Sequence, residues 1–127
     1  MATIARARPA PTSYQLIIEV AAPVRIAIGR LGSYDFPAGR YLYTGSAKGG
    51  VDARLRRHLR RDKRLHWHVD YLLAAPGVSV VATRRSAAGE CALNQRTAGR
   101  ILVPGFGASD CRAGCGSHLK WQGWPRR

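Results

Sequence analysis

The chain has 127 residues, of which 46% are hydrophobic, enough for one domain with its own core and too few for a second. Its 21 lysines and arginines outnumber its 7 acidic residues and give a formal net charge of +14 at pH 7. This balance favours a polyanionic partner, and it favours nucleic acid over a membrane surface.

Two further features indicate the cellular environment of the protein. The longest apolar stretch, residues 16–24, contains a glutamate and a proline and is far shorter than the roughly 20 residues that a membrane-spanning helix needs. Three cysteines do not suit the disulfide framework of a small secreted protein, so we expect reduced thiols. We therefore expect a cytoplasmic protein without a membrane segment.

The first third of the chain predicts a tail followed by short strands. Residues 1–13 are basic and rich in proline, so we expect a flexible tail, followed by one domain over residues 14–127. Residues 14–20 are apolar and β-branched, which is typical of a largely buried strand. Turn residues separate three further strands, and we expect the four strands to form a small meander. The three further strands are expected over residues 24–28, 34–36 and 40–44.

The rest of the chain predicts helices and a second group of strands. Val51, Leu55, His58 and Leu59 fall at helical spacing over residues 51–59, while arginines cover much of the remaining surface. Together with the strands, these helices indicate an α/β domain. We expect further helices over residues 65–75 and 89–99, a strand over 78–83, a short edge strand over 101–103 and a glycine-rich, irregular segment from residue 104 onward.

Four features follow one another in an order that suits phosphodiester hydrolysis. They are Tyr14 on the first strand, Tyr43-Thr44-Gly45-Ser46 at the end of another, Arg54 to His58 on a helix, and Glu90 in the first turn of a later helix. The reaction needs a base for the attacking water, a cation beside the phosphorus, and a divalent metal held by a carboxylate. A tyrosine, an arginine and a glutamate can supply these three roles. Arg54 and His58 are four residues apart, so their side chains share one face of the helix.

At these residues the sequence resembles the GIY-YIG nuclease superfamily, and more closely its small stand-alone Uri-type branch, DUF123. The second signature of that superfamily is present as Tyr43-Thr44-Gly45-Ser46 followed by Arg54-Leu55-Arg56-Arg57-His58. The first signature, Gly-Ile-Tyr, is reduced to Thr12-Ser13-Tyr14. Residues 65–71 and 104–111 point to the small branch, and the resemblance extends from about Tyr14 to His118.

The resemblance implies a small, mainly antiparallel sheet flanked by helices. It implies that Tyr14 and Tyr43 lie near the attacking water, that Arg54 contacts the phosphate, and that Glu90 holds one Mg²⁺ or Mn²⁺. His58 would assist proton transfer or orient the water. The expected activity is metal-dependent endonucleolytic cleavage of DNA, with RNA as the second substrate class. Two alternatives without chemistry are a nucleic-acid-binding module of the same fold and a basic RNA-associated protein.

Each of these residues also has a purely structural interpretation. The two tyrosines could pack as strand aromatics, His58 could be a surface residue, and Glu90 could merely complement the helix dipole. His66 and His68 flank Trp67, and we expect them to pack or to contact nucleic acid; Asp70 would cap a helix or pair with an arginine. The arginine face leaves a large positive charge without a partner, so phosphate binding is its expected use. The residues expected to bind nucleic acid are Lys48, Arg56, Arg57, Arg60, Arg61 and His66.

The last group of chemically active residues consists of cysteines and a histidine. Cys111, Cys115 and His118, with Cys91 brought in by the fold, have the chemistry of a closed zinc site. Their spacing is not that of a standard zinc knuckle. We expect buried, reduced thiols beside a hydrogen-bonded histidine, with zinc as the alternative.

Overall fold

The computed structural model describes residues 10–108, 111 and 113–124. Residues 1–9 of the predicted tail therefore lie outside the described residues. The end of that predicted tail belongs to the domain: the backbone N–H of Thr12 donates to the carbonyl of Ser86, and the carbonyl of Thr12 accepts from Ala47. Ser13 already begins the first strand.

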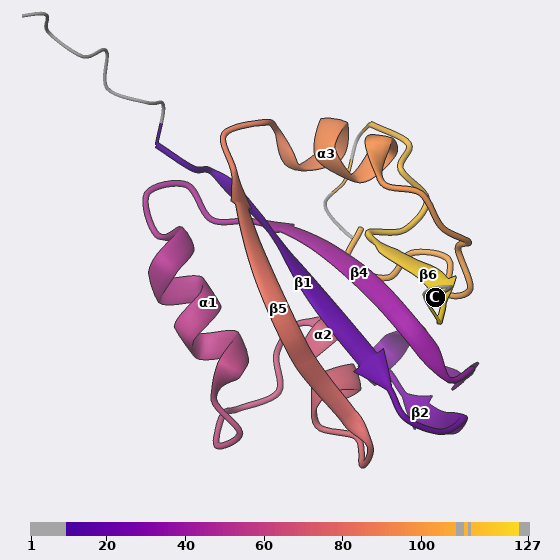
Figure 1. Ribbon diagram of the computed structural model, residues 1–127. Coiled ribbons are helices and arrows are strands. Elements are labelled where there is room, and N and C mark those ends of the chain that lie inside the picture. Colours follow the sequence, from indigo (N-terminus) through magenta and orange to yellow (C-terminus); the bar gives the residue numbers. More distant parts are fainter. Residues whose placement is uncertain (1–9, 109–110, 112, 125–127) are drawn as a thin grey trace, which may run out of the picture.

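A four-stranded antiparallel sheet forms the centre of the domain, as the α/β prediction with a mainly antiparallel sheet required (Figure 1). The strand order is β5-β1-β4-β6. The strands of this sheet are β1 (Ser13–Val20), β4 (Gly39–Ser46), β5 (Val78–Ser86) and β6 (Leu119–Gly123). The helices are α1 (Val51–Leu59), α2 (His68–Leu73) and α3 (Glu90–Arg96).

β1 lies between β5 and β4, and nearly all of its residues are buried. This burial explains its near-continuous apolar sequence, because a strand covered on both faces does not alternate between apolar and polar residues. Tyr14, Leu16 and Ile18 belong to the main core with α1 and α2. The β-branched residues of β1 thus hold the sheet together from its centre.

The predicted meander is wrong in its pairing. β1 pairs directly with β4, whereas β2 (Val24–Ala27) and β3 (Ser33–Phe36) form a separate two-stranded sheet. A short 3₁₀ turn, η1 (Gly29–Leu31), joins β2 to β3. Eight residues of β1 pair with eight of β4, whereas the hairpin strands pair over four residues each. A longer ladder can bury more apolar surface, which favours the direct contact of β1 with β4.

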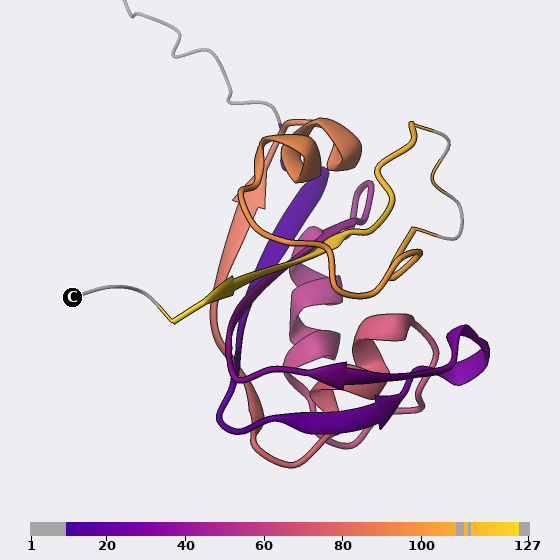
Figure 2. The same ribbon diagram turned by 90° about the vertical axis from the view of Figure 1, so that its right-hand side faces the viewer.

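Helices α1 and α2 cover one face of the sheet, as the side view shows (Figure 2). Val51, Leu55 and His58 of α1 are buried, as the helical spacing predicts, but Leu59 is 55% exposed. α2 begins three residues later than predicted, because the carboxylate of Asp70 accepts the backbone N–H groups of His66 and Trp67. This cap fixes where the helix starts.

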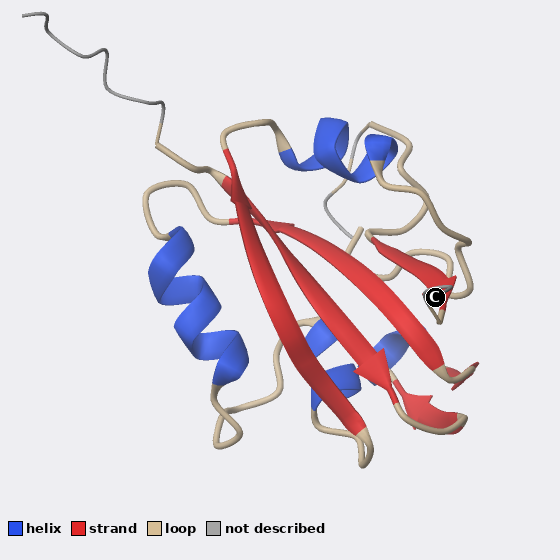
Figure 3. Cartoon of the chain, in the orientation of Figure 1, coloured by secondary structure: helices blue, strands red, loops and turns tan. Residues whose placement is uncertain are grey.

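The C-terminal segment is less irregular than its composition indicates. Residues 119–123 form β6 on the edge of the sheet, paired with β4, after a long loop that follows α3 (Figure 3). The predicted edge strand over 101–103 does not form; Arg100 instead makes an isolated bridge with Trp121. Lys120 and Trp121 did not indicate a strand in the sequence, because a lysine is not expected at a buried position. In the structure the Lys120 side chain is buried and donates to backbone carbonyls of α3 and of the residue after it.

α3 lies across the end of the sheet at which β1 begins and β4 and β5 end (Figure 1). The helix is shorter than the predicted range of 89–99: it ends at Arg96, and the backbone of Thr97 is extended. Within the described residues, no helix is long and apolar enough to cross a membrane.

Candidate active site

A cleft opens at this end of the sheet, with a volume of about 410 Å³. Four of the five predicted catalytic side chains line it: Tyr14 from β1, Tyr43 from β4, Arg54 from α1 and Glu90 from α3. The fifth, His58, lies behind Tyr14. The other lining residues are Ser46, His66, Trp67, His68, Gly107 and Cys111.

The strand register explains why Tyr14 faces the cleft beside a glycine. Tyr14 pairs with Gly45 across the β1–β4 ladder. A Cβ atom on Gly45 would overlap the Tyr14 hydroxyl. The glycine of Tyr43-Thr44-Gly45-Ser46 therefore leaves the space that the Tyr14 side chain occupies.

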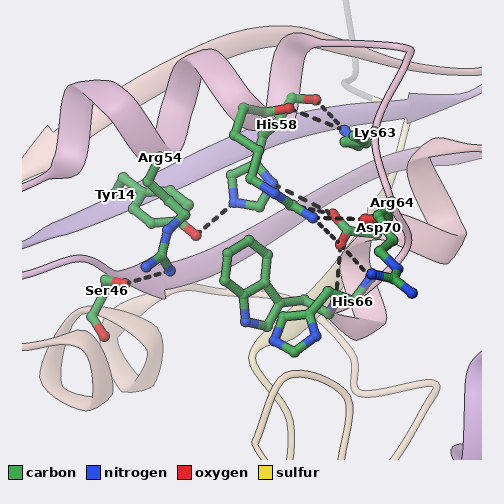
Figure 4. Close-up of polar contacts among 10 residues, drawn as sticks. Tyr14, Ser46, Arg54, His58, Lys63, Arg64, His66 and Asp70 are labelled. Atoms are coloured by element: carbon green, nitrogen blue, oxygen red, sulfur yellow. Dashed lines mark hydrogen bonds and ion pairs between the residues drawn. The ribbon is translucent and has the colours of Figure 1, made fainter.

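Tyr14 is hydrogen-bonded to a buried histidine (Figure 4). The Tyr14 hydroxyl lies 2.7 Å from Nε2 of His58, and Nδ1 of His58 lies 3.9 Å from a carboxylate oxygen of Asp70. Burial lowers the pKa of His58 to about 4, although the Asp70 carboxylate opposes this effect. The imidazole is thus neutral at pH 7, and with its proton on the nitrogen nearer Asp70 its Nε2 accepts from Tyr14.

Neither cleft tyrosine is ionised on its own at neutral pH. Burial raises the pKa of Tyr14 to about 12, although the neighbouring Arg54 guanidinium lowers it. Burial also raises the pKa of Tyr43 well above its ordinary value. Gly107 packs on the Tyr43 ring, since a Cβ there would lie 2.9 Å from a ring carbon. Of the two tyrosines, Tyr14 is the one whose hydroxyl is hydrogen-bonded to a proton acceptor within the described residues.

Arg54 and Arg57 both stack on Trp67 but differ in their partners. The two guanidinium carbons lie 4.3 Å and 4.2 Å from a ring centroid of Trp67. Arg57 makes a two-pronged ion pair with Asp70, at 2.9 and 3.0 Å. Arg54 donates to the backbone carbonyl of Ser46 and has no carboxylate partner within the described residues. Its charge remains available to an anion in the cleft.

Asp70 joins several parts of the site, as predicted for a residue that caps a helix or pairs with an arginine. It is fully buried, and burial by itself would raise its pKa. Hydrogen bonds from Arg57 and from the backbone of Trp67 and His66 outweigh burial and hold the pKa of Asp70 below its ordinary value. Asp70 is therefore an anion that fixes Arg57 and the start of α2.

Glu90 is the carboxylate of the cleft. It is the first residue of α3, and its side chain is 27% exposed. One of its oxygens lies 3.5 Å from Nδ1 of His118. Hard oxygen ligands of this kind, together with water and substrate phosphates, are those that Mg²⁺ and Mn²⁺ prefer.

The residues expected to bind nucleic acid do not all share one environment. Lys48, Arg56, Arg60, Arg61 and His66 are exposed, whereas Arg57 is half-buried in its ion pair. His66 lines the cleft. Arg60 and Arg61 line a second, larger cleft of about 750 Å³ beside α2 and β5, whose walls are mainly apolar. All five exposed side chains lie in α1 or in the loops that precede and follow it.

The three cysteines and His118 lie together behind Glu90. Their ligand atoms are all within 4.8 Å of one another, and the cysteines are free thiols. Backbone hydrogen bonds from Cys115 and Ala113 help to lower the pKa of Cys111 to about 6. The fold therefore brings Cys91 to the C-terminal cysteines, as the zinc alternative required. The expectation of buried thiols is wrong, because all three cysteines are only half-buried.

Comparison with known families places the chain in one of them. The family model of a domain of unknown function, DUF123, matches residues 13–124. The chain belongs to the DUF123 family. No curated protein and no solved structure matches it.

Two residues of this DUF123 protein shape the site through contacts that the sequence did not specify. The Trp67 ring stacks against the guanidinium groups of the two arginines. Nδ1 of His68 accepts the backbone N–H of Gly107 at 2.8 Å, which holds the loop over Tyr43. A signal was present in the sequence, because His66-Trp67-His68 concentrates polar aromatics in one turn. The partner of each side chain could not be read from that signal.

Proposed function

We propose that this DUF123 protein is a metal-dependent endonuclease of the GIY-YIG type that hydrolyses phosphodiester bonds, with DNA as its substrate and RNA as the second candidate. The observation that carries the proposal is the convergence of Tyr14, Arg54 and Glu90 on one cleft. A base, a cation and a metal-binding carboxylate are the groups that this hydrolysis requires. These groups come from three separate elements, β1, α1 and α3, so they are not close merely because they are neighbours in the sequence.

Tyr14 is the proposed base, acting through His58. The hydroxyl takes a proton from the attacking water and passes its own proton to Nε2 of His58, 2.7 Å away. The buried carboxylate of Asp70 then faces the protonated imidazole and stabilises its charge. Tyr14, whose pKa is raised to about 12, is not ionised at neutral pH and would therefore need this acceptor for its proton. Tyr43 would orient the water from the other side.

Arg54 is the proposed phosphate ligand. Its guanidinium is held in place by the Ser46 carbonyl and by the Trp67 ring, and a preorganised cation of this kind stabilises charge that develops on the phosphate. Its planar fork can donate two hydrogen bonds to phosphate oxygens. Arg57, which is already paired with Asp70, is the positioning partner on the same ring.

Glu90 is the residue that would hold the divalent cation. A bound Mg²⁺ or Mn²⁺ would neutralise charge on the leaving oxygen. The donor set fits such an ion, because one carboxylate in an open cleft leaves the remaining positions to water and to the substrate. The exposed Lys48, Arg56 and Arg60 would bind the flanking phosphates.

The test is a cleavage panel with duplex, single-stranded and flapped DNA and with RNA, each in Mg²⁺, Mn²⁺ or chelator. Cleavage is expected only with the cation, and Glu90→Gln should abolish it. Glu19→Gln is the matched control, because Glu19 pairs with Arg40 instead of lining the cleft. Equal residual cleavage by wild type and Glu90→Gln would contradict the proposal.

A nucleic-acid-binding module without catalysis is the second candidate. The observation in its favour is the raised pKa of both cleft tyrosines, which opposes their action as bases. It predicts that the wild-type protein binds nucleic acid tightly and that no substrate of the panel is turned over with any cation. Co-purified RNA that is bound and not cleaved would favour the RNA-associated form of this candidate.

A further inference from the structure

We propose that Cys91, Cys111, Cys115 and His118 form a structural zinc site, separate from the cation expected at Glu90. The four residues come from α3, from the loop after it and from the residue before β6. Their ligand atoms all lie within 4.8 Å of one another. Three thiolates and one imidazole are a complete donor set for tetrahedral zinc.

The distances fit a tetrahedral ion. With bonds of about 2.3 Å to zinc, neighbouring ligand atoms in a tetrahedral site are about 3.8 Å apart. The sulfurs of Cys91 and Cys111 are 3.4 Å apart, and Sγ of Cys91 lies 4.0 Å from Nε2 of His118. A disulfide would use only two of the four residues and would leave Cys115 and the buried His118 without a function in the cluster.

The surroundings of the cluster match those of a metal site. His118 turns Nε2 toward the sulfur of Cys91, while its Nδ1 is buried, makes no hydrogen bond within the described residues and lies 3.5 Å from a Glu90 oxygen. A zinc-bound histidine commonly donates its other N–H to a carboxylate, and the Glu90 carboxylate lies next to that nitrogen. The side chain of Gln95 donates to the sulfur of Cys115 at 3.6 Å, which would stabilise a thiolate.

Zinc here would hold the part of the fold that has least regular structure. Residues 97–118 contain no helix or strand within the described part of the chain. Yet this loop supplies Gly107 and Cys111 to the cleft, and Cys91 directly follows Glu90. A metal that joins α3 to the loop would therefore fix the position of the Glu90 carboxylate. Cys111 and Cys115 are only half-buried, which gives the ion a path to the site.

The test measures zinc in the whole protein, purified under reducing conditions from cells grown with added zinc. Elemental analysis should find one zinc ion per chain, and titration of the three thiols with a mercurial reagent should release it to a chelating dye. Cobalt(II) in place of zinc should give the intense visible bands and the thiolate charge-transfer band of a tetrahedral complex. These measurements use the wild-type chain and need no variant to fold.

Variants locate the site. Cys115→Ser and His118→Gln should lose the zinc, whereas His66→Gln, a histidine outside the cluster, should keep it. Glu90→Ala should weaken zinc binding about tenfold or more through His118, and Glu19→Ala should not. Zinc content is measured without any cleavage assay, so it is independent of the proposed nuclease activity. A reduced protein that binds no zinc, an octahedral cobalt spectrum, or a Cys91–Cys111 disulfide under these conditions would overturn the proposal.

Discussion

The hydroxyl of Tyr14 lies 2.7 Å from Nε2 of His58, so that the start of β1 and the last turn of α1 meet in one hydrogen bond at the cleft. Both groups are buried, and Asp70 faces the far nitrogen of the imidazole. The proposed proton transfer from Tyr14 requires a neutral His58. The protonation of His58 also affects folding stability, so it can be measured through stability as well as through activity.

His58 should make the protein less stable in mild acid. The unfolded chain takes up the proton near a pKa of about 6.5, whereas burial lowers the folded pKa to about 4. The stability that the low folded pKa of His58 contributes is fully present above about pH 6.5 and is lost as the pH falls toward 4. Of the neighbouring charges, Asp70 opposes the shift, while Lys63, Arg57 and Arg54 add to it.

The measurement compares wild type with His58→Gln by urea unfolding. The difference between their unfolding free energies should change by about 2 kcal/mol between about pH 7.5 and about pH 5, to the disadvantage of the wild type. Using a difference removes the groups that titrate equally in both proteins. A difference that is constant with pH would show that the folded chain protonates His58 as easily as the unfolded chain does.

Asp70→Asn should destabilise the fold by about 3 kcal/mol, because it leaves the half-buried Arg57 without its charge partner. It also weakens the cap on α2. Asp35→Asn is the matched control, since Asp35 forms an exposed pair with Arg25 and should change stability by about 0.5 kcal/mol or less. Thermal unfolding of the three proteins checks this prediction. Equal, small losses in both variants would mean that the Arg57 pair has no structural role.

Much of the fold could be predicted from the sequence, and the reasons differ by element. β1 and α1 follow from periodicity, because burial on both faces and burial on one face leave different apolar patterns. The edge strand β6 could not be found in this way. It has five residues, and its burial depends on Lys120 reaching carbonyls on α3, a contact that exists only after folding.

The candidate site shows the same division. Four of the residues that line the cleft, Tyr14, Tyr43, Arg54 and Glu90, were found from their order along the chain. The register of β1 on β4 brings the two tyrosines close in space, while α1 and α3 supply the other two residues. Which arginine would pair with Asp70 and which would stay free could not be predicted. Whether an arginine is free or paired depends on Asp70, 13 residues from Arg57, and no local pattern marks that pair.

Arg54→Lys should lower turnover by about tenfold or more while it changes affinity little. Lysine keeps the charge but loses the planar fork and the stacking on Trp67. Arg56→Lys is the matched control, because Arg56 is exposed on the same helix and does not line the cleft. Single-turnover rates with saturating enzyme, measured beside equilibrium binding, check the prediction. Equal rate losses in both variants would show that Arg54 is misassigned.

Binding should depend strongly on salt and little on sequence. With about five phosphate contacts, the logarithm of the affinity for duplex DNA should fall against the logarithm of the salt concentration with a slope of about −4 to −5. Replacing Arg56, Arg60 and Arg61 together by glutamine should lower the slope by about three units and weaken all sequences alike.

The control for this variant removes the same charge from other exposed positions, Arg30, Arg84 and Arg100. It should leave the slope nearly unchanged, because these residues lie outside α1 and the loops beside it. Fluorescence anisotropy over a salt series measures both variants. A salt slope near zero for the wild type, or the same change of slope in both variants, would contradict the assignment of Arg56, Arg60 and Arg61 to phosphate binding.

The most direct test of the proposed chemistry is the single-turnover rate of cleavage by Tyr14→Phe in Mg²⁺, beside that of Tyr41→Phe. Both changes remove one hydroxyl from a buried ring, but the Tyr41 hydroxyl donates to the carbonyl of Pro37, at 2.6 Å, and does not line the cleft. The account predicts that Tyr14→Phe is slower than wild type by roughly 10²-fold or more with binding preserved, while Tyr41→Phe cleaves at the wild-type rate. A Tyr14→Phe protein that cleaves as fast as wild type would contradict it.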